Sequence, residues 1–239
     1  MKLSKNILIL GASSDIGLKT TKLFLDKGWN VFGHYNNNVS SLKKLQKKYK
    51  KLKLFKFDLK KISSFEKYIS RNVNIARVDA FVSLTGYMKP TKFENFKIKD
   101  IQSHFNANYL ANILVIKKVV KYMIKKKWGR IVLGGSIGTK FGGGLNNFAY
   151  SLSKFNNQFF PAYYKKLYSK NITINTLQIG VSNTKIHKKI KSKNMKKRIQ
   201  LIPIKRMGNP NEVANYLFYL CSEENSLLTG SVINASGGE

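Results

Sequence analysis

The stretch "ILILGASSDIG", residues 7–17, ends an apolar run with a glycine and reaches a second glycine six residues later. Such a run is typical of a buried strand, and the residues that follow it are compatible with the start of a helix. A glycine turn between a strand and a helix directs free N–H groups of the helix N-terminus toward an anion. Asp15 adds a negative charge to this turn, which is favourable in the first turn of a helix. The stretch therefore predicts a strand, a turn and a helix that can bind a phosphate.

The rest of the chain repeats this alternation of short apolar runs and longer amphipathic segments. Strands are expected at residues 6–10, 30–34, 53–57, 78–84, 129–135, 172–179 and 231–235, and helices at about 16–27, 40–49, 63–71, 99–126, 149–169 and 210–222. Strands and helices that alternate in this way form crossovers, which give a parallel sheet covered on both faces. We expect an α/β fold, a Rossmann-like doubly wound parallel sheet of about seven strands with helices on both faces, in a single domain over residues 1–239.

Composition narrows the class of protein. Hydrophobic residues make up 43% of the chain, too many for a disordered protein. No apolar run approaches the roughly 20 residues that span a bilayer, so no membrane partner is expected. The single cysteine, Cys221, excludes an internal disulfide and a cysteine metal cluster. His34, His104 and His187 lack metal-ligand spacing, so we expect surface or packing histidines, no metal and a cytoplasmic location.

The charge of the chain is extreme, with 44 basic and 11 acidic residues and a formal net charge of +33. A field of this kind attracts polyanions, which is one argument for a nucleic-acid-binding protein. However, 39 of the basic residues are Lys and five are Arg, whereas nucleic-acid sites favour Arg for bidentate contacts. We interpret the charge as a lysine-rich compositional bias with a secondary attraction for anionic substrates.

A second motif is "GGSIGTKFGGGLNNFAYSLSK", residues 134–154. It contains Ser136 after an expected strand, a glycine-rich loop, and then Tyr150 and Lys154, which share one face of a helix at this spacing. Together with the first turn, the motif resembles the short-chain dehydrogenase/reductase family. The resemblance covers nearly the whole chain, and "NPNEVANYLFYLCSEENSLLTGSVINASGG", residues 209–238, is similar to the C-terminal segment of that family.

The resemblance implies catalytic roles for four residues. Tyr150 is expected to be the general acid in reduction and the base in oxidation. A free tyrosine has a pKa of about 10, and a neighbouring Lys154 ammonium is expected to lower it and to hold the nicotinamide ribose. Ser136 is expected to hydrogen-bond the substrate oxygen, where charge develops. Asn108 matches the helix asparagine that supports a water relay toward the lysine, with a better register than Asn106.

The resemblance also implies where a nicotinamide cofactor is held. The expected contacts are Gly11, Ser13, Ser14, Ile16, Gly17, Tyr35, Asn36, Asp58, Leu59, Gly86 and Thr184, together with Tyr150 and Lys154. Asp58 is assigned to the adenine, and Thr184 to the nicotinamide amide and the phosphates. Tyr35 stands where an acidic residue selects NAD, and no carboxylate is near it, so we expect NADP rather than NAD.

Three departures from the family pattern stand out. Asp15 replaces the usual middle glycine of the first turn, "SLTG" at residues 83–86 replaces Asn-Asn-Ala-Gly, and Ile179-Gly180 replaces Pro-Gly. We expect these changes to affect substrate geometry near the nicotinamide more than the fold or the proton chemistry.

The combined reading is an NADPH-dependent oxidoreductase that reduces a ketone to a secondary alcohol, most similar to the 3-oxoacyl-(acyl-carrier-protein) reductases. One alternative is a keto-sugar or nucleotide-sugar reductase in surface-glycan synthesis. Another, from a different class, is a non-catalytic nucleotide-sensing or nucleic-acid-binding protein, against which the complete catalytic set argues.

Three partner expectations accompany this reading. The carbonyl substrate is small and is expected to be carried on an acyl carrier protein or a nucleotide. Lys127, Arg130 and Lys170 are candidates to receive an acidic carrier. Residues 184–200, with seven lysines, are expected to form a lid that captures a phosphate-bearing substrate. The family also implies a homodimer or homotetramer.

Overall fold

The computed structural model describes residues 4–186 and 194–239. Seven strands form one sheet in the order β3-β2-β1-β4-β5-β6-β7, and every neighbouring pair is parallel. The strands are β1 (Asn6–Leu10), β2 (Asn30–Tyr35), β3 (Leu52–Lys56), β4 (Ala80–Ser83), β5 (Gly129–Gly134), β6 (Ile172–Ile179) and β7 (Val232–Ala235). The strand order reverses between β1 and β4, and ligands of doubly wound sheets bind at such a switch point. The predicted fold class is confirmed.

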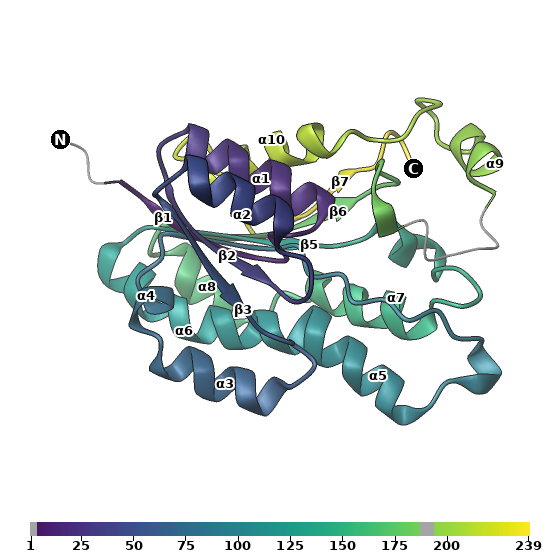
Figure 1. The fold of residues 1–239 in the computed structure, drawn as a ribbon, viewed down its shortest axis with the longest axis horizontal. Coiled ribbons are helices and arrows are strands. Elements are labelled where there is room, and N and C mark those ends of the chain that lie inside the picture. The colour runs from purple at the N-terminus through teal and green to yellow at the C-terminus, as the bar shows by residue number, and fades with distance from the viewer. Residues whose placement is uncertain (1–3, 187–193) are drawn as a thin grey trace.

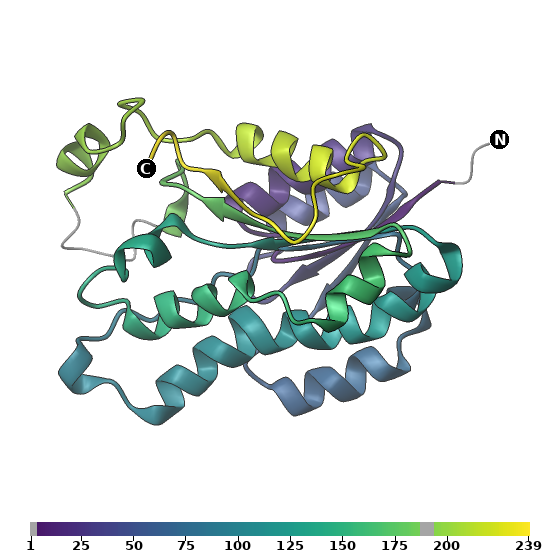
Figure 2. The same cartoon turned by 180° about the vertical axis from the view of Figure 1, so that it is seen from behind.

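Helices cover both faces of the sheet (Figure 1). One face carries α1 (Asp15–Asp26), α2 (Ser40–Lys48) and α10 (Pro210–Cys221), and the other carries α3 (Ile62–Arg71), α4 (Val73–Ala76), α5 (Ile98–Phe105), α6 (Ala111–Lys126), α7 (Phe148–Phe155) and α8 (Tyr163–Tyr168). The helix α9 (Met195–Gln200) lies apart from both layers, beyond the end of the sheet. Figure 2 shows α10 lying across the sheet beside α1, where Phe24 and Phe218 bring their ring centroids to 5.1 Å.

The first strand shows why the chain forms two packed layers. Ile7 and Ile9 belong to the core on the α1 and α10 side, whereas Leu8 and Leu10 belong to the core under α3 and α6. All four side chains are fully buried. Because neighbouring residues of a strand point to opposite faces, a strand covered on both sides must be apolar throughout. Cys221 is fully buried in the same core as Ile7, as expected for a packing residue.

Two predicted helices differ from the structure. The helix expected over residues 149–169 is interrupted, because α7 continues as a short 3₁₀ turn at Asn156–Gln158 and then ends before α8. Pro161 lies in the gap, and a proline lacks the N–H that a continuing helix needs and disfavours helical geometry in the residue before it. The helix expected over residues 99–126 is present as α5 and α6, joined by a π-helical turn at Asn106–Leu110. Such turns are frequent at functional sites.

The loops that follow β4, β5 and β6 meet at one end of the sheet. The 3₁₀ turn Ile137–Phe141 follows β5, and a second short turn at Phe93–Asn95 precedes α5. This is the end toward which α9 lies in Figure 1. Within the two described ranges of the chain, no helix is both long and apolar enough to span a lipid bilayer.

Candidate active site

The turn between β1 and α1 is formed by close backbone contacts. Gly11 has a φ of +77°, and a Cβ there would lie 2.6 Å from the carbonyl oxygen of Leu84. A Cβ on Gly17 would lie 2.2 Å from the carbonyl oxygen of Gly11. Ser14 is the N-cap of α1, and its Oγ accepts a hydrogen bond of 3.0 Å from the Gly17 N–H. Both glycines are therefore required for the tight turn that presents the N-terminus of α1.

A buried histidine supports this turn from β2. The Gly11 N–H donates to His34 Nδ1 at 3.1 Å, and the Ala12 N–H donates to the His34 carbonyl at 2.9 Å. Nε2 of His34 lies 2.9 Å from the Phe57 carbonyl, so Nε2 carries the proton. Burial lowers the pKa of His34 to about 4, which keeps the ring neutral near pH 7. The sequence predicted a surface or packing residue, and the structure shows that this histidine holds the glycine turn.

Ser136, Tyr150 and Lys154 come together at the carboxyl end of β5. Ser136 is the N-cap of the 3₁₀ turn after β5, and Tyr150 and Lys154 lie one turn apart on α7. Ser136 and Tyr150 line the same two cavities, and the Ser136 hydroxyl acts on the Tyr150 pKa. Lys154 is only 4% exposed, and its Nζ donates to the carbonyls of Gly134 and of Thr85, the latter at 2.8 Å.

Burial shifts the pKa values of Tyr150 and Lys154. Burial raises the pKa of Tyr150 to about 12, and the Ser136 hydroxyl offsets only part of this rise. Lys154 is not among the causes of this shift, and its Nζ donates to two backbone carbonyls. The expected effect of Lys154 on the Tyr150 pKa stays a prediction. Burial also lowers the pKa of Lys154 to about 8. Near pH 7 the tyrosine therefore carries a proton and most of the lysine is still an ammonium.

Asn108 links the segment after β4 to α7. Its Oδ1 accepts from the Tyr87 N–H at 2.8 Å, and its Nδ2 donates to the Tyr87 carbonyl at 2.9 Å and to Ser153 Oγ at 3.0 Å. Ser153 Oγ in turn donates to the Tyr150 carbonyl at 2.7 Å. Asn106 instead donates to the Lys60 carbonyl at 2.9 Å, away from this group. The structure thus joins Asn108, and not Asn106, to the helix that carries Tyr150.

Two further asparagines, which the sequence did not single out, contact the Asn108 carbonyl. Nδ2 of Asn112 donates to it at 2.9 Å, and Nδ2 of Asn157 donates to it at 3.0 Å. Both side chains are 1% exposed. For Asn112, a polar residue in the apolar run 110–116 was a signal that could have pointed to this buried cluster, whereas Asn157 lies between polar neighbours. The water relay expected at Asn108 stays a prediction, and its carbonyl already accepts two amide hydrogen bonds.

Two cavities meet beside Tyr150. A cavity of about 440 Å³, which we call the cofactor cavity, extends toward the first turn. It is lined by Ser13, Ser14, Asp15, Ile16, Asn38, Leu84, Thr85, Gly86, Gly134, Gly135, Ser136, Tyr150, Lys154, Ile179, Gly180, Ser182, Thr184, Lys185 and Ile186. A second cavity of about 680 Å³, which we call the substrate cavity, shares Ser136, Tyr150, Ile179, Gly180 and Ile186 with it.

The predicted cofactor residues divide into three groups. Ser13, Ser14, Ile16, Gly86, Tyr150, Lys154 and Thr184 line the cofactor cavity, and Gly11 and Gly17 shape the turn beside it. Tyr35, Asn36, Asp58 and Leu59 lie at or after the carboxyl ends of β2 and β3 without lining that cavity. Tyr35 packs against one core and Leu59 is buried in the other. The residue after β2 that does line the cavity is Asn38, which the sequence did not single out.

Two of the three departures from the family pattern make local hydrogen bonds, and at the third Ile179 packs against the core on the α1 and α10 side. Ser83 and Thr85 of "SLTG" hydrogen-bond to each other through their hydroxyls at 3.1 Å. Gly180 is retained because a Cβ there would lie 2.5 Å from Cα of Ser236. Asp15 does not cap α1; its Oδ2 accepts a hydrogen bond of 2.6 Å from the backbone N–H of Lys185.

The glycine-rich loop before α7 has a packing requirement that the sequence did not reveal. Gly142 and Gly143 have φ values of +70° and +85°. A Cβ on Gly143 would lie 2.0 Å from Ser151 Oγ, so this glycine lets the loop lie against α7.

The three basic residues expected to receive an acidic carrier protein are not all accessible at the surface. Arg130 is 2% exposed and donates to the carbonyls of Ser222, Gly129 and Asn171, so its expected contact with an acidic carrier is wrong. Lys127 and Lys170 directly precede β5 and β6. They therefore lie at the amino ends of the strands, whereas the two cavities lie at the carboxyl ends. Of the expected lid, residues 187–193, which include His187, Lys188, Lys189 and Lys191, lie outside the described residues.

The doubly wound sheet, the glycine turn after β1, and the group of Ser136, Tyr150 and the buried Lys154 at the carboxyl end of β5 are features of a nucleotide-binding oxidoreductase. Comparison with known proteins agrees. A family model described as enoyl-(acyl carrier protein) reductase matches residues 11–239. The 3-oxoacyl-[acyl-carrier-protein] reductase FabG of Thermotoga maritima is 30% identical over 239 residues, which cover 98% of this chain and 97% of that protein.

Two solved structures share the fold. A 3-oxoacyl (acyl-carrier-protein) reductase from Agrobacterium tumefaciens C58 with NADP bound has a TM-score of 0.86 at 21% identity, covering 98% of this chain and 94% of that one. ElxO with NADP bound has a TM-score of 0.84 at 24% identity, covering 99% and 98%. The chain belongs to the short-chain dehydrogenase/reductase family, and it is an oxidoreductase of that family.

Proposed function

We propose that this protein is an NADPH-dependent 3-oxoacyl-thioester reductase that converts the 3-oxo group of a carrier-bound acyl chain to a 3-hydroxyl group. The observation that carries this proposal is the lining of the substrate cavity. Met88, Ile137, Phe141, Leu145 and Ile186 make it largely apolar, which suits an acyl chain. Lys92 and Arg198 also line it; Arg198 is ion-paired with Glu239, and the exposed Lys92 suits an anionic group of a carrier arm.

The residues beside the cavity support a reduction in which atoms and charges balance. The cofactor, when bound, supplies a hydride to the ketone carbon. The ketone oxygen takes its proton from the Tyr150 hydroxyl, and the Ser136 hydroxyl donates a hydrogen bond to that oxygen as negative charge develops. The Lys154 ammonium stabilises the tyrosinate that remains until a proton from solvent restores it. The roles of Tyr150, Ser136, Lys154 and Asn108 are part of the proposal.

The cofactor cavity suits a dinucleotide. The glycine turn leaves no room for a Cβ where the backbone must approach a diphosphate, and the N-terminus of α1 favours an anion. Asn38, rather than an acidic residue, lines the cavity after β2, so a 2′-phosphate meets no carboxylate from this strand end. Two of the solved relatives in fold carry NADP, which also supports NADPH over NADH.

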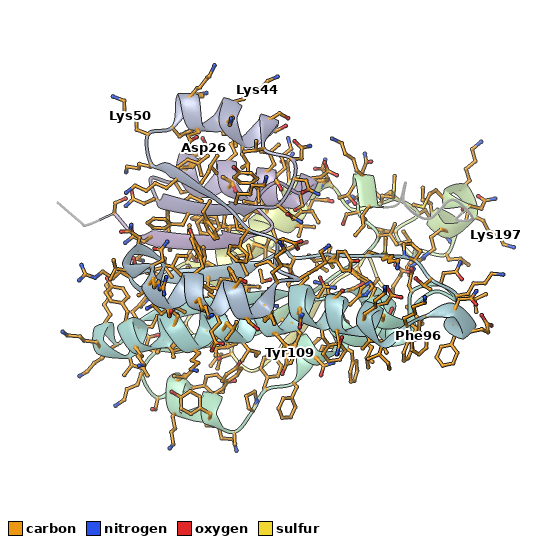
Figure 3. All side chains as sticks on the ribbon, turned by 60° about the horizontal axis from the view of Figure 1, so that its bottom comes forward. Asp26, Lys44, Lys50, Phe96, Tyr109 and Lys197 are labelled. Atoms are coloured by element: carbon orange, nitrogen blue, oxygen red, sulfur yellow. The ribbon has the colours of Figure 1, made fainter. Side chains whose placement is uncertain are left out.

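The alternatives receive less support. A keto-sugar needs hydrogen-bonding side chains around its hydroxyls, whereas the substrate cavity is lined mainly by apolar residues and glycines. A nucleic-acid site needs cations gathered on one surface. Figure 3 shows Lys44 and Lys50 beside α2 and Lys197 at the far end of the molecule, so these labelled lysines do not share one surface.

The remaining partner features are proposals of the same kind. Phe155, Phe159 and Tyr163 are 56%, 66% and 51% exposed on and after α7. Such neighbouring exposed apolar side chains are typical of a protein–protein contact, and we propose that they lie in a homodimer or homotetramer. We also propose that residues 1–239 form one domain and that the protein is cytoplasmic.

The proposal is tested with a panel of thioesters. The purified protein is assayed for NADPH oxidation with 3-oxoacyl, trans-2-enoyl and keto-sugar substrates, and NADH is compared at equal concentration. We expect turnover of 3-oxoacyl thioesters with NADPH. Turnover of the enoyl thioesters alone indicates reduction of a carbon–carbon double bond, and turnover of keto-sugars alone indicates the sugar alternative. Either result rejects the proposed substrate.

A further inference from the structure

One wall of the cofactor cavity is formed by the first turn of α1, and the facing wall is formed by residues 182–186, which make few hydrogen bonds to other described elements. Residues 182–186 follow β6 and line this cavity through Ser182, Thr184, Lys185 and Ile186. The beginning of the segment is fixed, because the Asn183 N–H donates to the Gly208 carbonyl at 2.9 Å. Beyond Asn183, the hydrogen bonds of the described residues include one that ties the segment to another element, the bond from the Lys185 N–H to Asp15.

This bond joins the two walls of the cavity. Asp15 and Lys185 are 170 residues apart, and both line the cofactor cavity. On one side Asp15 stands in the first turn of α1, directly after Ser14, and on the other side Lys185 follows Thr184. The bond is 2.6 Å long and its acceptor is a carboxylate oxygen, which makes it a charge-assisted hydrogen bond.

Asp15 is free to make this bond because other groups satisfy the helix. Ser14 caps α1 through the Gly17 N–H, so the carboxylate is not needed as a cap. The positive end of the helix still favours negative charge at Asp15. A glycine at this position, as in the family pattern, offers no acceptor to Lys185.

We propose that Asp15 is a positioning residue that latches residues 182–186 across the cofactor cavity and thereby slows the release of the bound dinucleotide. The inference rests on the proposed nicotinamide dinucleotide. A dinucleotide held between the α1 turn and this segment leaves only when the two walls separate. Each opening breaks the bond between Asp15 and Lys185, so the bond adds to the cost of release.

Asp15 could also act in the opposite direction on cofactor binding, by repelling the cofactor instead of retaining it. A carboxylate beside a cofactor diphosphate also repels it, and repulsion predicts that loss of the charge tightens binding. The two effects separate in a pair of variants. Asp15→Asn keeps an acceptor oxygen and loses the charge, whereas Asp15→Ala loses both.

The first measurement is made without cofactor and does not depend on the proposed function. Hydrogen exchange of the Lys185 amide is followed in the full chain. We expect Asp15→Ala to speed this exchange about tenfold, and Asp15→Asn to leave it within about threefold of the wild type, since local opening governs exchange. Lys185→Ala is the matched control, because it removes the side chain and keeps the N–H, and its residue 185 amide should stay protected.

The second measurement is the dissociation rate of NADPH, followed by stopped-flow fluorescence. We expect Asp15→Ala to raise this rate about fivefold to tenfold, in keeping with a partly exposed hydrogen bond to a charged acceptor. Asp15→Asn, which keeps a neutral acceptor, should fall between the wild type and Asp15→Ala. Equal exchange and equal dissociation in all variants, or slower dissociation in both Asp15 variants, overturns the latch. A wild-type protein that binds neither NADPH nor NADH instead overturns the proposed function.

Discussion

The two cavities that meet at Tyr150 are built from different parts of the fold. The cofactor cavity takes its walls from the carboxyl ends of β1, β4, β5 and β6 and from the first turn of α1. The substrate cavity takes much of its lining from the loop between β5 and α7, which includes Phe141, Gly143 and Leu145. Phe141 is 59% exposed and Leu145 is 95% exposed.

This difference separates what the fold determines from what the loops add. Residues at strand ends are fixed by sheet register, so the cofactor cavity has little freedom to vary. Exposed loop residues are held by few contacts, and binding specificity is commonly placed on such loops. We therefore expect changes in the first cavity to alter cofactor binding, and changes in the second to alter substrate binding.

The largest effect is expected where the cavities join. Tyr150→Phe keeps the ring and removes the transferable proton. Loss of a general acid costs about 10²–10⁴-fold in rate. We expect kcat to fall by at least this factor, while the Kd of NADPH, measured by fluorescence, stays within about threefold because no cofactor contact needs the proton. A folded Tyr150→Phe protein with normal turnover contradicts the assignment.

The pH profile tests Lys154 at the same junction. Burial lowers the pKa of Lys154 from 10.5 to about 8, so its ammonium is lost as the pH rises through about 8. Tyr150, whose pKa is raised to about 12, keeps its proton over this range. We expect kcat/KM for reduction to be flat below pH 8 and to fall about tenfold per pH unit above it, as for one essential ionisation. The Kd of NADPH over the same range is the control, and a profile that stays flat to pH 9.5 contradicts this role.

The preference for NADPH over NADH tests the role of the cofactor cavity. Tyr35→Asp, the change suggested by the sequence, places a charge where Tyr35 packs against the core, so it confounds specificity with stability. Asn38 is exposed, lines the cavity and accepts hydrogen bonds from the backbone and side chain of Ser40 through Oδ1. An aspartate keeps that acceptor. We expect Asn38→Asp to shift the ratio of kcat/KM for NADPH to that for NADH about tenfold toward NADH, because the charge repels a 2′-phosphate.

A neutral control accompanies this change. Asn38→Ser keeps a short polar side chain without the charge, and its cofactor preference should remain that of the wild type. A wild-type preference for NADH, or an Asn38→Asp protein with an unchanged ratio, shows that the end of β2 does not discriminate between the cofactors.

The sequence could predict the part of the cofactor cavity formed by the first turn and by α7, because its signals there are local. A glycine turn after an apolar strand, and Tyr and Lys four residues apart, have one structural reading once the strands alternate with helices. The contacts between distant segments could not be predicted. The bond from Lys185 to Asp15, the support of Gly11 by His34, and the place of Asn38 in the cavity depend on how loops cross the sheet edge. The burial that raises the pKa of Tyr150 likewise follows from packing, which no spacing reveals.

The smallest effect is expected in the loop of the substrate cavity, at two adjacent glycines that form a matched pair. Gly143 has a φ of +85° and a Cβ there would meet Ser151 Oγ at 2.0 Å, whereas a Cβ on Gly144 would have Asn147 Nδ2 at 3.4 Å as its nearest neighbour. An alanine with left-handed backbone geometry costs about 1–2 kcal/mol, so Gly143→Ala should move the loop away from α7. We expect it to raise KM for a 3-oxoacyl thioester about fivefold, in line with that cost, and to leave the Kd of NADPH unchanged. Gly144→Ala should leave both constants near those of the wild type. If Gly143→Ala weakens NADPH and substrate equally, the two cavities are mechanically coupled through this loop, and the separation drawn between them is wrong.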